Sequence, residues 1–238
     1  MTVTVGCGAA KRNDCLFYTG MSIASIITVF VGFALTYYLK NYFGAAPLTP
    51  LVHLHGLVFT SWILLFFAQN VLIASHQIGI RRRLGVAGAG LAALLVVVGL
   101  TTAVAFARRT VATGGAGTLA FLAIPFGAMF VFAILAGAGI LYRRRPEMHK
   151  RLMLVATISI LGAAISRWPF AIMQTGPVPF FVVTDIFILA GVCYDLVSRR
   201  RTHSAYVCGG LLLLLSQPLR LAIGHTEPWL DLVGMLVR

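Results

Sequence analysis

The chain has 238 residues, of which 59% are hydrophobic and 11% are charged, and its mean hydropathy is +0.93. This apolar fraction excludes an ordinary water-exposed domain. The net charge of +13 does not indicate a nucleic-acid partner, because the basic residues stand in short clusters between apolar runs. Anionic membrane lipid is the expected counter-charge.

The apolar runs predict transmembrane helices. About 20 apolar residues cross the hydrocarbon core, and each backbone polar group in lipid needs a partner within the protein, which favours helices over open sheets. Barrel strands would alternate polar and apolar residues, and these runs do not. We predict seven spans, near 19–39, 51–74, 84–106, 117–142, 151–173, 179–197 and 205–224. No linker divides them, so residues 1–238 are expected to form one all-α polytopic transmembrane domain.

The distribution of lysine and arginine predicts the orientation. Thirteen of the 19 basic residues fall on one side of the predicted spans, at 11–12, 81–83, 143–151 and 199–201. Cytoplasmic loops carry such an excess, so the N-terminus is expected in the cytoplasm and the C-terminus outside. The expected location is a bacterial inner (cytoplasmic) membrane. The expected partners are membrane lipid and other subunits of a membrane complex.

The first and last segments have separate interpretations. The first span follows Lys11 and Arg12, but it is long enough to cross the membrane and lacks a small-residue cleavage site, so we expect it to be retained. Near the C-terminus, Thr226 as a cap and Glu227 in the first turn predict a helix near 227–237. This segment is too short to span, and we expect it to lie in the outer interface.

Five ionisable side chains are predicted at membrane depth, where charges are costly and therefore often functional or paired. They lie toward the outer ends of four spans: His53, His55, Arg167, Asp185 and Arg220. One interpretation is a buried ion pair of Asp185 with Arg167 or Arg220. The other is a pocket in which the same residues bind an anionic or carbonyl-bearing ligand, such as the propionates of a haem, a quinone head group or a lipid head group.

His53 and His55 are the candidate metal or haem ligands, because imidazole commonly binds haem iron, copper and zinc. Residues at i and i+2 of a helix point about 200° apart, so we expect one ring to face the bundle and the other to face lipid or the interface. The alternative is a hydrogen-bonded histidine between helices. On the outer side, a bis-histidine haem would need His225 as its second ligand. The inner histidines are expected at solvated helix ends: His76, His149 and His203.

Two further polar features lie within spans. Trp62, Gln69 and Asn70 form a stripe toward the cytoplasmic end of the second span. Side-chain amides there most often cross-link helices, and a proton or substrate path is the functional alternative. Pro218 in the seventh span predicts a kink near Arg220, because proline removes a backbone hydrogen bond.

Several functions are excluded by what the sequence lacks. The lysines are Lys11, Lys40 and Lys150, so none lies mid-membrane to form the Schiff base of a retinal protein. The chain has no phosphate-binding glycine loop, HExxH motif or nucleophile elbow. Six scattered histidines are too few for a His-box hydroxylase, and four cysteines without CxxC spacing do not indicate a disulfide framework.

The run Leu51–Gly56, continued through Trp62 and Gln69 to Arg82–Gly85, resembles a group of uncharacterised bacterial polytopic membrane proteins. These pair a histidine-bearing span with a basic HRRLG-type loop. His149–Met153 resembles the related HRRxM pattern, and some distant relatives of that pattern are linked to haem-copper oxidase assembly or resemble b-type cytochromes. The present chain has Arg81 where the loop histidine would stand. The resemblance therefore implies an inner haem site only if His76 substitutes.

The sequence thus predicts an inner-membrane protein whose outer-leaflet polar pocket binds b-type haem, copper or quinone in electron transfer or oxidase-related work. No enzyme class is assigned. The alternative is a cofactor-free small-molecule transporter, a membrane assembly factor or a structural subunit of a larger membrane complex. The first hypothesis depends on His53 or His55, and the transporter hypothesis depends more on Asp185, Arg167 and Arg220.

Overall fold

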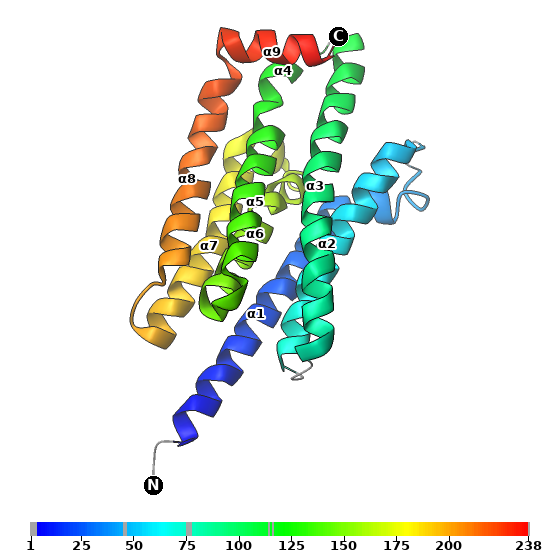
Figure 1. Cartoon of the computed structure of the whole chain (residues 1–238). Coiled ribbons are helices and arrows are strands. Elements are labelled where there is room, and N and C mark those ends of the chain that lie inside the picture. The colour runs from blue at the N-terminus through cyan, green and yellow to red at the C-terminus, as the bar shows by residue number, and fades with distance from the viewer. Residues whose placement is uncertain (1–3, 45–46, 75–77, 114, 116, 238) are drawn as a thin grey trace.

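The computed structural model describes residues 4–44, 47–74, 78–113, 115 and 117–237, with side chains from residue 12 onward except at 73–83. Throughout this part, the regular structure is helical, and seven helices are long and apolar enough to cross a membrane. They lie side by side as a bundle (Figure 1). The prediction of an all-α polytopic transmembrane bundle is therefore confirmed. The side chains of His76 and Arg81–Arg83 lie outside the described part.

The long helices follow the predicted apolar runs, because each run satisfies its own backbone hydrogen bonds. The elements are α1 (Thr4–Phe33), a π-helical turn (Ala34–Tyr38), α2 (Pro50–Ala74), α3 (Ile78–Ala112), α4 (Thr118–Phe121), α5 (Ala123–Leu141), a 3-10 turn (Tyr142–Arg144), α6 (Pro146–Ile165), a second 3-10 turn (Ala171–Gln174), α7 (Pro177–Arg199), α8 (Ser204–Gly224) and α9 (Glu227–Val237).

Helix α6 is shifted toward the N-terminus from its predicted span, 151–173. It begins earlier, at Pro146, because proline fits the first turn of a helix, and it ends at Ile165. Pro169 accounts for the early end, since a proline disfavours the helical conformation of the residue before it and cannot continue the hydrogen-bond ladder. Arg167, predicted within the fifth span, therefore lies in the connection after α6.

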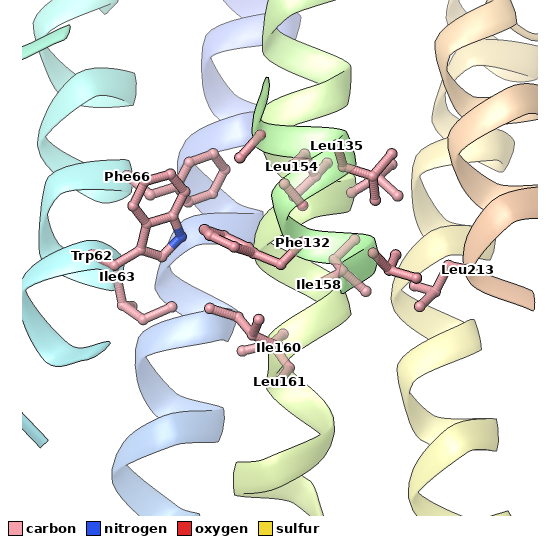
Figure 2. Packing of buried hydrophobic residues seen from close by; sticks show 14 of the residues in the cluster. Trp62, Ile63, Phe66, Phe132, Leu135, Leu154, Ile158, Ile160, Leu161 and Leu213 are labelled. Atoms are coloured by element: carbon pink, nitrogen blue, oxygen red, sulfur yellow. The ribbon is translucent and has the colours of Figure 1, made fainter. Parts of the chain in front are cut away.

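Helix α6 is the centre of the bundle, with 12 of its 20 residues buried. It packs against α1, α2, α5, α7 and α8. Figure 2 shows side chains of α2, α5, α6 and α8 meeting in this core. Trp62 stands edge-on to Phe132, with 5.0 Å between the ring centroids. Large apolar side chains in interlocking positions thus fix the inner faces of the helices.

Helices α1 and α6 also approach through a glycine. A Cβ added to Gly32 would overlap the backbone carbonyl of Ala164. Small residues allow such close backbone contact between helices in lipid, where the hydrophobic effect does not drive association.

The two ends of the bundle differ in charge. One end carries Arg12, Arg143–Arg145, Lys150 and Arg199–Arg201, and we name it the basic end. At the other end, α9 lies across α3, α4 and α8 (Figure 1), and we name this the α9 end. Its contacts include a hydrogen bond from the Trp229 indole to the Leu119 carbonyl at 3.1 Å. The helix predicted near 227–237 is therefore present as α9.

Candidate functional site

A buried ion pair joins α6 to α7 at the basic end. Arg151 Nε donates to Asp195 Oδ2 at 2.9 Å, and Arg151 Nη2 donates to Asp195 Oδ1 at 2.6 Å. Neither side chain has any exposed surface. The third donor of the guanidinium, Nη1, bonds to the backbone and side chain of Glu147, both at 2.8 Å. Such two-point pairing offsets the cost of removing both charges from water.

Asp14 connects α1 to the same group. Its carboxylate accepts from Lys150 Nζ on α6 and from Arg199 Nη2 on α7, both at 2.6 Å, and from the Tyr194 hydroxyl, also at 2.6 Å. Lys150 donates in addition to Glu147 at 2.7 Å. A short polar side chain near the start of α1 is thus tied to two other helices.

The start of α8 completes the arrangement. The backbone N–H of His203 donates to Asp195 Oδ2 at 3.1 Å, and His203 Nδ1 accepts from the Ala205 N–H at 3.1 Å as the cap of α8. The imidazole therefore carries its proton on Nε2. Burial, and then the positive charge of Arg151, lower the pKa of His203. A neutral His203 is the form that caps the helix.

We name these residues the basic-end network: Asp14, Glu147, Lys150, Arg151, Tyr194, Asp195, Arg199 and His203. Its three carboxylates and three cationic side chains balance in charge. It joins α1, α6, α7 and α8, and the sequence analysis did not predict it. A signal was present, because Asp14, Glu147 and Asp195 are acidic residues on the side where arginine predominates. The basic residues there had been interpreted through orientation alone.

A cavity of about 90 Å³ lies next to the network, between α2, α3, α5 and α6. Its walls are mostly apolar, with Trp62 and Phe66 from α2 and Met153 from α6. On α3, Gly85 lines the cavity, and a Cβ added there would have no atom within 4 Å. The small residue therefore leaves the space open. The polar lining comes from Gln69, Asn70, His149 and Lys150.

Asn70 is the unusual member of this lining. Its side chain is only 5% exposed, and its Nδ2 is buried without a hydrogen-bond partner among the described residues. A buried amide N–H without a partner costs about 1–3 kcal/mol. The amides of span two were expected to cross-link helices, and the Nδ2 of Asn70 does not. Asn70 thus lines the cavity while its amide donor has no partner in the described part of the chain.

His149 and Lys150 form the edge shared by the cavity and the network. His149 Nδ1 donates to the Gly139 carbonyl of α5 at 2.7 Å. Lys150 lines the cavity while it bonds to Asp14 and Glu147. A ligand in the cavity would therefore lie beside the charged groups that hold α1.

The two candidate histidines of α2 differ in exposure, as their spacing implies. His53 is exposed, and its backbone carbonyl accepts from the Tyr37 hydroxyl at 3.2 Å. His55 is half-buried and stacks on Phe59, with 4.1 Å between the ring centroids, and its Nδ1 has no hydrogen-bond partner in the part of the chain that the structure describes. His225 follows α8, on the opposite flank of the bundle from α2 (Figure 1). Among the described residues, no three His, Cys, Asp or Glu side chains cluster as metal ligands do.

The other predicted outer residues do not form the expected ion pair. Asp185 Oδ1 accepts from Gln217 Nε2 at 2.7 Å. Arg220 Nη2 donates to Ser216 Oγ at 2.8 Å, and Arg167 donates to the Ala163 carbonyl and lies over the Phe33 ring. Arg220 lies against Gly127 of α5, and Gln217 is the α8 residue that reaches Asp185 on α7.

A second cavity, of about 140 Å³, lies between α1 and α2. Its lining is apolar apart from Tyr38 and Thr60, and these two hydroxyls bond to each other at 2.7 Å. It therefore presents no unpaired polar group to a ligand, unlike the cavity at the basic end.

No family model, curated protein or solved structure matches this chain.

Proposed function

We propose that this integral membrane protein binds a small amphipathic molecule with a hydrogen-bond-accepting head, of the quinone class, in the cavity at the basic end. The buried Nδ2 donor of Asn70 carries the proposal, because it has no partner among the described residues and Asn70 lines the cavity. A quinone carbonyl is an acceptor that would satisfy this donor. The aromatic and aliphatic walls suit a planar apolar ring.

The depth of the cavity supports an amphipathic ligand. Asn70 lies four residues before the end of α2 at Ala74, and Gly85 lies seven residues after the start of α3 at Ile78. At 1.5 Å per residue, these residues lie about 6 and 10 Å from the ends of their helices. The head of a lipid-soluble molecule reaches this level while its chain remains in the hydrocarbon. The charge distribution predicts that this end faces the cytoplasm.

If bound, a quinone would supply two-electron redox chemistry. The residues of this chain would hold and orient it: Asn70 donates to a carbonyl, Trp62 and Phe66 pack against the ring, and His149 and Lys150 stand at the polar edge. This proposal keeps the quinone of the sequence-based prediction and changes its site from the outer to the inner end of α2.

Trp62 provides a direct test, because it lines the cavity and the chain has only three tryptophans. In a Trp168→Phe/Trp229→Phe background, the remaining fluorescence reports on the cavity. We expect a short-chain ubiquinone analogue to quench it saturably in mild detergent. Asn70→Leu should weaken this binding about tenfold, the effect of losing one hydrogen bond of about 1.4 kcal/mol.

Two glycines of α3 provide a matched pair. Gly85→Leu should abolish the saturable quenching, because the new side chain enters the cavity. Gly90→Leu should leave it unchanged, because Gly90 is exposed, has open space at its Cβ and does not line the cavity. Linear quenching of equal slope in all variants would mean that the quinone only partitions into the micelle. That outcome contradicts the proposal.

A further inference from the structure

The α9 end contains a buried cation without an anion. Arg220 on α8 is only 6% exposed, and its Nε is buried with no hydrogen-bond partner among the described residues. Ser216 Oγ accepts from Nη2 at 2.8 Å, but a hydroxyl carries no charge. A guanidinium at this depth is costly unless an anion accompanies it.

The described part of the chain supplies no such anion. Its six Asp and Glu side chains all lie in the described part. Three belong to the basic-end network, and Asp185 is bonded to Gln217. The remaining two, Glu227 and Asp231, are exposed on α9, and no ion pair with Arg220 is formed in the described residues.

The neighbouring helix makes room for this side chain. A Cβ added to Gly127 on α5 would lie 2.5 Å from Arg220 Cγ and 2.6 Å from Nε. The guanidinium therefore lies against a bare stretch of α5 backbone, and Gly127 itself is only half-buried. No α5 side chain therefore stands between the α5 backbone and the guanidinium at Gly127.

Depth and geometry identify the ligand chemistry. Arg220 lies four residues before the end of α8 at Gly224, which is about 6 Å along the helix. This is close to the level of lipid head groups. A guanidinium matches the oxygens of a phosphate better than an ammonium does, because its donors form a rigid planar fork. Next to Arg220, Leu219 is exposed on the outer face of α8, where a lipid would lie.

We propose that Arg220, with Ser216 and Gly127, forms a binding site for one phosphate group between α5 and α8. The site is independent of the cavity at the basic end. Its phosphate comes either from a phospholipid head group or from free inorganic phosphate, and both sources use the same contacts.

The test uses the full-length protein, delipidated in detergent, and its thermal unfolding midpoint. Dioleoylphosphatidylglycerol and inorganic phosphate are added in separate titrations. We expect one of them to raise the midpoint saturably, and Arg220→Gln to weaken that effect at least about tenfold, because a charge-assisted contact is lost. Arg167→Gln is the matched control, since it also removes one arginine charge near the same end and should keep the effect.

If Arg220→Gln misfolds, a second variant and a second measurement still test the proposal. Gly127→Ala keeps the charge but places a methyl group on the guanidinium, and it should weaken the same effect. Phosphorus NMR of the wild-type protein should show a shifted, broadened resonance for the bound phosphate. An effect of the lipid alone identifies a lipid site, and an effect of inorganic phosphate identifies a free-anion site. Equal responses of the wild type and both site variants to both probes, without a shifted resonance, would overturn the proposal.

Discussion

Arg151 and Asp195 form a two-point ion pair in which both side chains are fully buried, with N–O distances of 2.9 and 2.6 Å. The pair lies where α6, α7 and the start of α8 meet. The same guanidinium also bonds to Glu147, and the same carboxylate accepts from the His203 N–H. This one pair therefore links α6 to α7 and to the start of α8.

Asp195→Leu should destabilise the protein by about 3–5 kcal/mol, because it leaves the Arg151 guanidinium buried without its partner. Unfolding in sodium dodecyl sulfate, followed by circular dichroism, measures the change. The double variant Arg151→Met/Asp195→Leu should recover a large part of the loss, since an apolar pair needs no charge compensation.

Asp231→Asn is the control for this experiment, because Asp231 is exposed on α9 and its replacement should change stability by less than about 0.5 kcal/mol. A cost for Asp195→Leu as small as that of the control would mean that the ion pair does not hold the basic end together.

The fold could be predicted from the sequence because a transmembrane helix is a local property. Span length and apolar composition suffice to place it, and the shift of α6 follows from Pro146 and Pro169. Side-chain partners are not local. Whether Asp185 meets Gln217 or Arg220 depends on the rotation of α7 against α8, which hydropathy does not fix.

The candidate site was predicted only in part for the same reason. Trp62, Gln69 and Asn70 were identified as a polar stripe, but a cavity arises only when α3 and α6 pack against it. The basic-end network needs residues from α1, α6 and α7 that are more than 130 positions apart in the chain, such as Lys150 and Asp14. No periodicity within one helix signals such a contact.

The cap of α8 makes stability depend on pH. The pKa of His203 in the folded protein is below its ordinary value, through burial and the charge of Arg151. The unfolded chain therefore binds the proton first, so this contribution to stability is present above the ordinary imidazole pKa of about 6.5 and is lost as pH falls through the folded pKa. Protonation also places a hydrogen on Nδ1, which then cannot accept from the Ala205 N–H.

His203→Asn isolates this effect, because asparagine caps helices well and does not titrate. The unfolding midpoint of the wild type should fall between about pH 7 and pH 5 by more than that of the variant. Other groups titrate equally in both proteins, so their difference reports on His203. Parallel pH profiles would show that the cap does not titrate in this range.

The contact between α1 and α6 predicts opposite effects at two glycines of α1. Gly32→Ala should destabilise the protein by about 1–3 kcal/mol, because the new methyl group overlaps the Ala164 carbonyl and forces the helices apart. Gly20→Ala has open space at its Cβ and should be neutral or slightly stabilising, since alanine is the better helix former. Unfolding midpoints in the same detergent measure both, and equal midpoints would contradict the close packing at Gly32.

The structure distinguishes the two histidines of α2 that the haem or copper hypothesis names as candidate ligands. His55 is half-buried with an unpaired Nδ1, whereas His53 is exposed, so a ligand role falls to His55.

Under the haem or copper hypothesis, the purified protein shows a Soret band that shifts on dithionite reduction, or stoichiometric copper by elemental analysis. His55→Ala should remove this signal and His53→Ala should retain it. A signal that survives replacement of both histidines would exclude α2 as the source of the ligand. A sample without the signal, with cofactor loss during purification excluded, leaves the cavity beside Asn70 as the redox candidate.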